Sequence, residues 1–203
     1  MAHRVLSKTL SFILVAVVMG FAGIAYGDKD ADKRTAGNSR LSVKERMAAC
    51  EKLLATDGLS KTDRAWALCM RGSLNRRGKK YDAALADFAA AEKLEPDNPR
   101  VFRYRGNLYF ETKKYKQSEA DLSKALELEP RNSWTWYTRG RVRGRLRKYQ
   151  EALKDHGKAL EIKPRYSSAY SARAWLHLRL KNYDKAFITE CDAFGFGYDG
   201  VGF

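Results

Sequence analysis

The stretch "YKQSEADLSKALELEP", residues 115–130, decides the fold, because it returns in altered form as "YDAALADFAAAEKLEP" at 81–96 and "YQEALKDHGKALEIKP" at 149–164. Each copy holds about four turns of good helix formers and stops at a proline, which cannot continue a helix. A second helical segment precedes each copy and begins with a capping residue, such as Asn98 or Asn132. The unit is therefore predicted to be a helix, a short charged turn and a second helix.

The units keep a constant spacing of 34 residues, and the same residue types recur at the same positions. Self-similarity at this period indicates stacked helical hairpins, each of which buries a face against its neighbours. The series that share a position are Gly72, Gly106 and Gly140 with Ala174; Arg71, Arg105, Arg139 and Arg173; Tyr81, Tyr115, Tyr149 and Tyr183; Ala91, Ala125, Ala159 and Ala193; and Pro96, Pro130 and Pro164.

This pattern resembles the tetratricopeptide repeat family, whose 34-residue unit is two antiparallel helices. Counted from Ala65, the large residue at position 4, the small residues at positions 8 and 20 and the proline at position 32 match. His156 and Glu190 depart from the bulky apolar residue at position 24, and Tyr198 replaces a fourth proline. The resemblance implies an all-α fold, a right-handed α-solenoid of about four helix-turn-helix units at 65–98, 99–132, 133–166 and 167–200.

The segments around the repeats are assigned from shorter patterns. Ser42 and Glu45 are spaced as a capping box and predict an N-terminal capping helix, which with its turn takes up residues 42–64. A polar linker is predicted at 28–41, and residues 201–203 form a short tail.

Residues 1–27 have the pattern of a bacterial-type secretory signal. Arg4 and Lys8 precede an uncharged stretch at 9–27 that exits through small residues before Asp28. We therefore expect a periplasmic or secreted protein. The alternative is an inner-membrane anchor through residues 9–27, because this stretch approaches the roughly 20 apolar residues that cross a bilayer.

The chain is basic, with 39 Lys and Arg against 24 Asp and Glu and a formal charge of +15, which favours anionic partners. Five arginines alternate along one predicted helix. At 100° per residue they split into two stripes on opposite faces, Arg139, Arg143 and Arg147 on one, and Arg141 and Arg145 on the other.

The first arginine stripe is predicted to be structural. Arg71, Arg105 and Arg139 each have an aspartate sixteen residues later, across the turn of the hairpin. A guanidinium fork suits a carboxylate, so we expect three ion pairs within repeats. They are Arg71 with Asp87, Arg105 with Asp121, and Arg139 with Asp155.

The second stripe belongs to the predicted binding surface. In the family, positions 2, 5, 6, 9, 12 and 13 of the first helices line a concave groove, and here these positions are aromatic and basic. Such side chains are typical of interface hot spots and suit an acidic peptide. The predicted groove residues are Trp66, Arg103, Tyr104, Asn107, Phe110, Trp134, Tyr137, Arg141, Arg145, Trp175 and Arg179. The alternative for any single aromatic residue is packing between repeats.

Some members of the family clamp a C-terminal carboxylate with cations and asparagines at set positions. Arg103 and Asn107 fit the first pair of that pattern, but Thr138, Ser168 and Ala172 do not fit the rest. A clamp for a terminal carboxylate is therefore not expected.

The resemblance implies a non-catalytic scaffold or adaptor that binds a peptide or protein segment, and we expect no enzyme activity, cofactor or metal. One alternative is a basic binder of polyanions, either envelope phosphates or nucleic acid, although an exported protein rarely meets nucleic acid. A cryptic enzyme is a third. "GFGYDG" at 195–200 imitates a dinucleotide loop but lacks the helix that should follow. A disulfide between Cys50 and Cys69, the oligomeric state and the partner's identity stay open.

Overall fold

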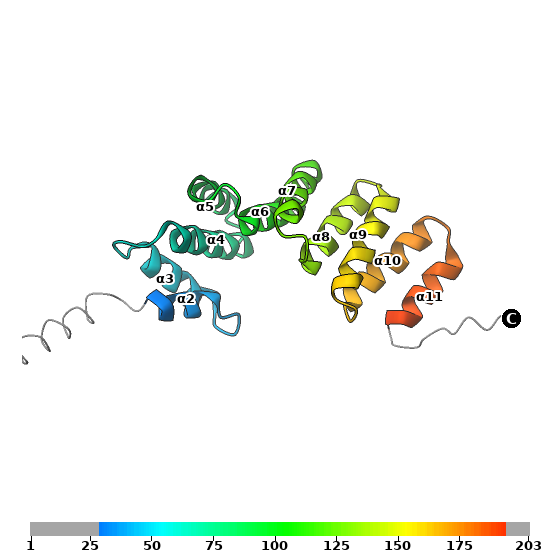
Figure 1. Ribbon diagram of the computed structural model, residues 1–203, viewed down its shortest axis with the longest axis horizontal. Coiled ribbons are helices and arrows are strands. Elements are labelled where there is room, and N and C mark those ends of the chain that lie inside the picture. The colour runs from blue at the N-terminus through cyan, green and yellow to red at the C-terminus, as the bar shows by residue number, and fades with distance from the viewer. Residues whose placement is uncertain (1–28, 194–203) are drawn as a thin grey trace, which may run out of the picture.

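A computed structural model of the chain describes residues 29–193, which contain ten helices and no strand. The helices form hairpins that follow one another along an elongated all-α solenoid (Figure 1). Their bounds are α2 Lys29–Gly37, α3 Val43–Leu54, α4 Lys61–Arg77, α5 Tyr81–Leu94, α6 Pro99–Glu111, α7 Tyr115–Leu128, α8 Ser133–Arg145, α9 Tyr149–Ile162, α10 Ser167–Arg179 and α11 Tyr183–Ala193. The fold class predicted from the repeat is confirmed.

The way the helices contact one another defines an inner side of the solenoid. Each first helix packs on the second helix of its own unit, as α4 does on α5 and α8 on α9. Consecutive first helices also touch, α4 with α6, α6 with α8 and α8 with α10. Among the described helices, consecutive second helices do not. The first helices α4, α6, α8 and α10 therefore lie on the inner side of the curve, and we call their shared surface the inner face.

The turns inside the hairpins repeat one backbone conformation. Lys79, Lys113, Arg147 and Lys181 all have φ between 59° and 61°, the left-handed region that glycine usually occupies after a helix. A basic side chain at this point interacts favourably with the negative end of the helix dipole. The charged turns predicted from the sequence thus end the first helices.

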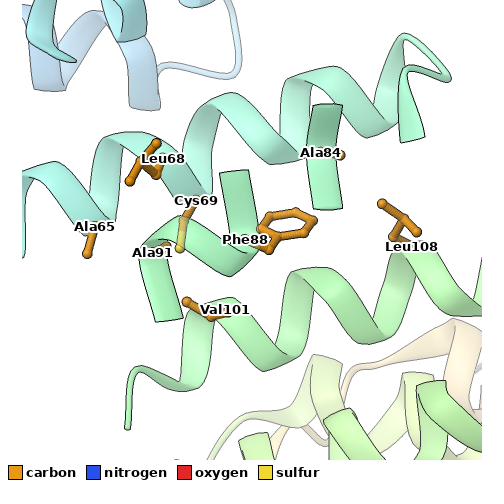
Figure 2. Close-up of a cluster of buried hydrophobic side chains, with 8 residues drawn as sticks. All are labelled: Ala65, Leu68, Cys69, Ala84, Phe88, Ala91, Val101 and Leu108. Carbon is orange, nitrogen blue, oxygen red and sulfur yellow. The ribbon is translucent and has the colours of Figure 1, made fainter. Parts of the chain in front are cut away.

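The core explains why the repeat needs glycine at position 8. Phe88 of α5 lies between α4 and α6 and fills the centre of one apolar cluster (Figure 2). A Cβ added at Gly72 would lie 2.7 Å from the Phe88 ring, and one added at Gly140 would lie 2.7 Å from the His156 ring. Position 8 is therefore small because the side chain at position 24 occupies the adjacent space.

The three predicted ion pairs within repeats are confirmed. Arg71 meets Asp87 at 2.6 Å, and Arg105 meets Asp121 and Arg139 meets Asp155 at 2.8 Å each. Two of these arginines also reach the preceding unit, which the sequence pattern did not predict. Arg105 bonds to Glu92 at 2.5 Å, and Arg139 bonds to Ser123 at 3.1 Å. This row of charged groups joins neighbouring hairpins.

The N-terminal region differs from the prediction of a polar linker at 28–41. Residues 29–37 form α2, which packs against α3 and α4. Ala36 of α2 is fully buried, and its carbonyl accepts a hydrogen bond from the Arg46 side chain at 2.9 Å. Lys33 pairs with Asp63 at 2.5 Å. The helix is thus stabilised by contacts with residues distant in sequence, and these contacts cannot be predicted from its polar composition.

Helix α3 begins at the capping box formed by Ser42 and Glu45, as predicted. Helix α4 begins at Lys61, four residues before the expected start of the first unit at Ala65. Ser60 caps it by accepting a hydrogen bond from the Asp63 backbone at 3.0 Å.

None of the helices between residues 29 and 193 has the length and apolar character needed to cross a bilayer. The predicted signal or anchor at 1–27, the loop-like sequence at 195–200 with Tyr198, and the tail at 201–203 lie outside the described residues.

Candidate functional site

A pocket of about 370 Å³ opens between α8 and α10, and we call it the α8–α10 pocket. It combines cations, one indole ring and small apolar groups. Its lining is Gly140, Arg141, Gly144, Arg145, His156, Ala172, Trp175, Leu176 and Arg179. Four of the predicted groove residues, Arg141, Arg145, Trp175 and Arg179, therefore meet at one place.

Small residues on the facing helices make room for this pocket. Gly140 and Gly144 stand on α8, one turn apart, and Ala172 stands on α10. A Cβ added at Gly144 would lie 3.8 Å from Leu176 and 3.9 Å from the Trp175 ring, in ordinary contact. Gly144 thus brings the backbone of α8 close to the apolar side chains of α10, whereas Gly140 faces His156 of α9.

The three arginines of the pocket differ from those of the structural stripe in their partners. Arg139 and Arg143 both bind the buried carboxylate of Asp155. Arg141, Arg145 and Arg179 are exposed, and no carboxylate among the described residues pairs with them. Their positive charge is consequently available to a ligand.

Aromatic rings hold two of these guanidinium groups in place. The guanidinium of Arg179 lies 4.9 Å from the centre of the Trp175 ring. That of Arg141 lies 4.7 Å from the Phe110 ring and 5.6 Å from the Tyr137 ring. Such contacts stabilise a cation over the face of a ring. Arg141 thereby extends the site from the pocket towards α6.

His156 forms the inner wall of the pocket and is almost fully buried. Burial, followed by the charges of Arg141 and Arg173, lowers its pKa from 6.5 to about 4. The imidazole is therefore neutral at pH 7, and its Nδ1 has no hydrogen-bond partner among the described residues. The sequence pattern placed His156 in the core but gave no signal that it borders a pocket.

Three predicted groove residues have other roles in the structure. Trp66 packs against Gly37 of α2, with Lys33 at 5.7 Å from its ring, so the N-terminal helix covers part of it. Arg103 pairs with Glu129 at 3.0 Å. Tyr104 packs against the apolar cluster around Phe88, with its ring 6.4 Å from the Phe88 ring. For Tyr104, packing between repeats is the better description.

The other four predicted residues occupy intermediate situations, and one of them, Phe110, lies against the Arg141 guanidinium. Tyr137 packs its ring 5.0 Å from Tyr166 and 5.6 Å from His156, and so belongs to both the core and the rim of the site. Trp134 is 36% exposed but does not line the α8–α10 pocket. Asn107 is half-buried on α6.

The two described cysteines are free thiols in separate apolar clusters. Cys50 lies with Met70 and Leu74, whereas Cys69 lies in the cluster around Phe88, so the disulfide left open by the sequence is not formed. Burial raises the pKa of Cys50 to about 11 and that of Cys69 to about 12. Within residues 29–193, no three His, Cys, Asp or Glu side chains are grouped to hold a metal ion.

Comparison with known proteins places this geometry in a family. Residues 69–133 and 122–154 match two family models, each described as a tetratricopeptide repeat. No curated protein sequence matches the chain.

Solved structures show the same fold. A crystal structure of MamA is 18% identical, with a TM-score of 0.67 over 84% of this chain and 95% of MamA. MamA 41-end from Desulfovibrio magneticus RS-1 is 15% identical, with a TM-score of 0.69 over 87% and 99%. The first TPR of Spaghetti (RPAP3), bound to the HSP90 peptide SRMEEVD, is 28% identical, with a TM-score of 0.57 over 58% and 94%. The family models show that residues 69–154 consist of tetratricopeptide repeats, and the same helical hairpins continue in the helices that follow, up to Ala193.

Proposed function

We propose that the chain is a scaffold whose inner face binds a peptide or protein segment of acidic character. The observation that carries this proposal is the gathering of the Trp175 ring and the guanidinium groups of Arg141, Arg145 and Arg179 in the α8–α10 pocket, where no carboxylate of residues 29–193 pairs with these arginines. On the opposite face of α8, Arg139 and Arg143 are already engaged with Asp155.

The side chains of this face have the properties of binding hot spots. Trp175 is 43% exposed and Trp134 is 36% exposed, which leaves large rings available for contact. Aromatic residues and arginine contribute most of the energy in many interfaces. Because the guanidinium groups of Arg141 and Arg179 already rest on aromatic rings, less side-chain freedom is lost when a partner binds.

The acidic character of the partner follows from charge and is supported by one relative. The net charge of +15 and the unpaired arginines favour an anionic guest. The RPAP3 repeat domain is bound to a peptide with three acidic residues in seven. That protein matches little more than half of this chain, so its ligand indicates a class of partner and no particular one.

Peptide display provides the test. The chain is immobilised and panned against a library of random 12-residue peptides, and the enriched peptides are titrated. We expect saturable binding that falls about tenfold or more in Trp134→Ala and in Arg141→Gln, since each removes one hot-spot side chain. Ile162→Ala is the matched control, because Ile162 is also 36% exposed but lies at the end of α9.

Salt separates this proposal from binding of polyanions. A partner held by phosphate contacts loses about three to five orders of magnitude of affinity between 50 and 200 mM salt. We expect a much weaker dependence for the selected peptides. A steep slope, no enriched peptide, or equal binding by all three variants would refute the peptide proposal, and the first result would favour polyanions.

Export of the protein is a separate proposal that rests on residues 1–27. Cell fractionation followed by N-terminal sequencing distinguishes its two forms. Release of a chain that starts at Asp28 indicates a cleaved signal, whereas an intact N-terminus in the membrane fraction indicates an anchor through residues 9–27.

A further inference from the structure

Three arginines of the inner face that lack a carboxylate partner among residues 29–193 gather at one pocket. Towards the N-terminus, Arg76 forms an ion pair with Glu111, and Arg103 forms one with Glu129 at 3.0 Å. Near the C-terminus, Arg141, Arg145 and Arg179 line the α8–α10 pocket without a carboxylate partner among residues 29–193. A partner therefore meets two arginines that are neutralised by glutamates along α4 and α6, and three available arginines gathered around one pocket between α8 and α10.

The same pocket offers an apolar surface next to these charges. Trp175 projects from α10 with its ring in edge contact with Tyr149, 6.4 Å between centres, and with 43% of its surface exposed. Leu176 and Ala172 line the pocket beside it. The volume of about 370 Å³ is within the range of pockets that hold a compact ligand group. One large side chain and its charged neighbours fit this combination.

We propose that the α8–α10 pocket is the anchoring subsite of the scaffold and takes an aromatic side chain of the partner, flanked by two carboxylates. The aromatic ring packs against Trp175 and Leu176. The carboxylates bind the guanidinium groups of Arg145 and Arg179, which come from the two helices that face each other. This inference rests on the proposed function and specifies the chemistry of its site.

Carboxylates suit these arginines because a planar guanidinium binds a carboxylate through two parallel hydrogen bonds. The chain itself shows this arrangement, since Arg139 holds Asp155 through Nε at 3.0 Å and Nη2 at 2.8 Å. A polynucleotide is the less suitable guest. It requires a continuous basic track with several stacking platforms, whereas Arg76 and Arg103 on the adjoining part of this face are neutralised by glutamates.

The neutral side chain of His156 makes the inner wall of the subsite suitable for an apolar ring. Its imidazole lies beneath Gly140 and adds no positive charge at pH 7, because its pKa is about 4. The positive charge of the pocket therefore lies on the exposed Arg141, Arg145 and Arg179, while the buried imidazole adds none. An acidic residue bound at the rim keeps part of its hydration, and an apolar ring enters the interior. The subsite therefore favours a peptide in which acidic residues flank an aromatic residue over a peptide that carries acidic residues alone.

The probe is a fluorescein-labelled peptide, Gly-Glu-Glu-Phe-Glu-Glu-Gly, followed by fluorescence anisotropy with the full chain. We expect Arg145→Gln and Arg179→Gln each to weaken binding about tenfold, which corresponds to the loss of a hydrogen bond to a charged group. Trp175→Ala is expected to weaken it to a similar degree. Arg165→Gln is the matched control, because Arg165 is exposed and lies outside the pocket, so that its loss changes affinity less than about twofold.

Matched peptides separate the two parts of the proposal. Replacing the four glutamates by glutamine tests the charge, and replacing phenylalanine by alanine tests the ring. Each change is expected to weaken binding to the wild-type chain by about tenfold or more. Inorganic phosphate at 10 mM and a single-stranded oligonucleotide are added as competitors, and neither is expected to displace the peptide.

Several results would overturn the inference. They are failure of the probe to bind the wild-type chain, equal affinity for the glutamine peptide, equal affinity of Arg145→Gln, Arg179→Gln and Arg165→Gln, and displacement by the oligonucleotide or by phosphate. Circular dichroism shows whether each variant is folded, and these side chains are exposed enough for their replacement to leave the core intact. If peptides selected by display still bind Arg179→Gln normally, the subsite is wrong and the scaffold proposal stands. If no peptide binds any form, both fail.

Discussion

Replacing Asp155 by alanine is expected to destabilise the solenoid more than replacing any exposed acidic residue. Asp155 is almost fully buried and accepts hydrogen bonds from two arginines of α8. Arg139 reaches it at 2.8 Å, and Arg143 at 2.9 Å. Only 12% and 19% of these two arginine side chains is exposed, so the substitution leaves two poorly hydrated cations without their shared carboxylate.

The magnitude follows from what remains after the carboxylate is removed. Breaking a buried pair by deleting one partner costs about 3–5 kcal/mol. Arg143 keeps Glu119 at 3.0 Å, and Arg139 keeps Ser123 at 3.1 Å, which retains part of the stabilisation. We therefore expect a loss at the lower end of that range, about 3 kcal/mol. Asp87→Ala should cost less, about 1–2 kcal/mol, because it frees a single and more exposed arginine, Arg71.

The assay is urea unfolding followed by circular dichroism at 222 nm, with the free energy taken from the linear dependence on denaturant. The control is Glu127→Ala, which removes an exposed pair with Lys124 on the surface of α7 and should cost less than about 0.5 kcal/mol. If Asp155→Ala and Glu127→Ala unfold at the same urea concentration, the charged row between helices contributes nothing to stability. The structural interpretation of the first arginine stripe would then be rejected.

Two further predictions concern the glycines of the repeats and the buried histidine at position 24. Gly72→Ala should destabilise the chain by about 1–3 kcal/mol, because the new Cβ would meet the Phe88 ring. Gly157→Ala should stabilise it by about 0.5–1 kcal/mol, because a Cβ there would have no atom within 4 Å and alanine is the better helix former. Urea unfolding of both variants checks this, and effects of the same sign would contradict it. Because the pKa of His156 is about 4 when folded and 6.5 when unfolded, stability is fully present above pH 6.5 and falls by up to roughly 3 kcal/mol as the pH drops to 4. In His156→Leu, which imitates the packing of Leu122, this contribution should vanish, and an unchanged pH slope between 7 and 5 would disprove it.

The parts of the structure that repeat could be predicted from the sequence. Arg139 and Asp155 recur as a pair in three units, so their contact could be inferred from spacing alone. Helical geometry placed Arg141 and Arg145 on the opposite face, and the structure brings both to one pocket. The grouping of these arginines with Trp175 likewise follows from the repeat, since positions 9 and 13 of adjacent first helices lie side by side.

The parts that occur once could not be predicted in this way. Glu129 neutralises Arg103 from the end of α7, and nothing in the spacing of the units identifies that pairing. Helix α2 covers part of Trp66 through contacts such as that of Lys33 with Asp63, which join segments thirty residues apart. The composition of a segment indicates whether that segment has enough apolar residues to fold by itself. Helix α2 is stabilised instead by contacts with α3 and α4, which form only when the chain is folded.

The proposed binding site is best located by the positions at which the units differ. Position 13 holds Arg77 in the first unit, Glu111 in the second, and Arg145 and Arg179 in the last two. Glu111 pairs with Arg76 and so removes charge from the inner face between α4 and α6. In the last two units the same position is basic on both helices, and the charge stays available. A repeat fold fixes where side chains point, whereas the choice of side chain in each unit decides which segment of that surface can hold an anion.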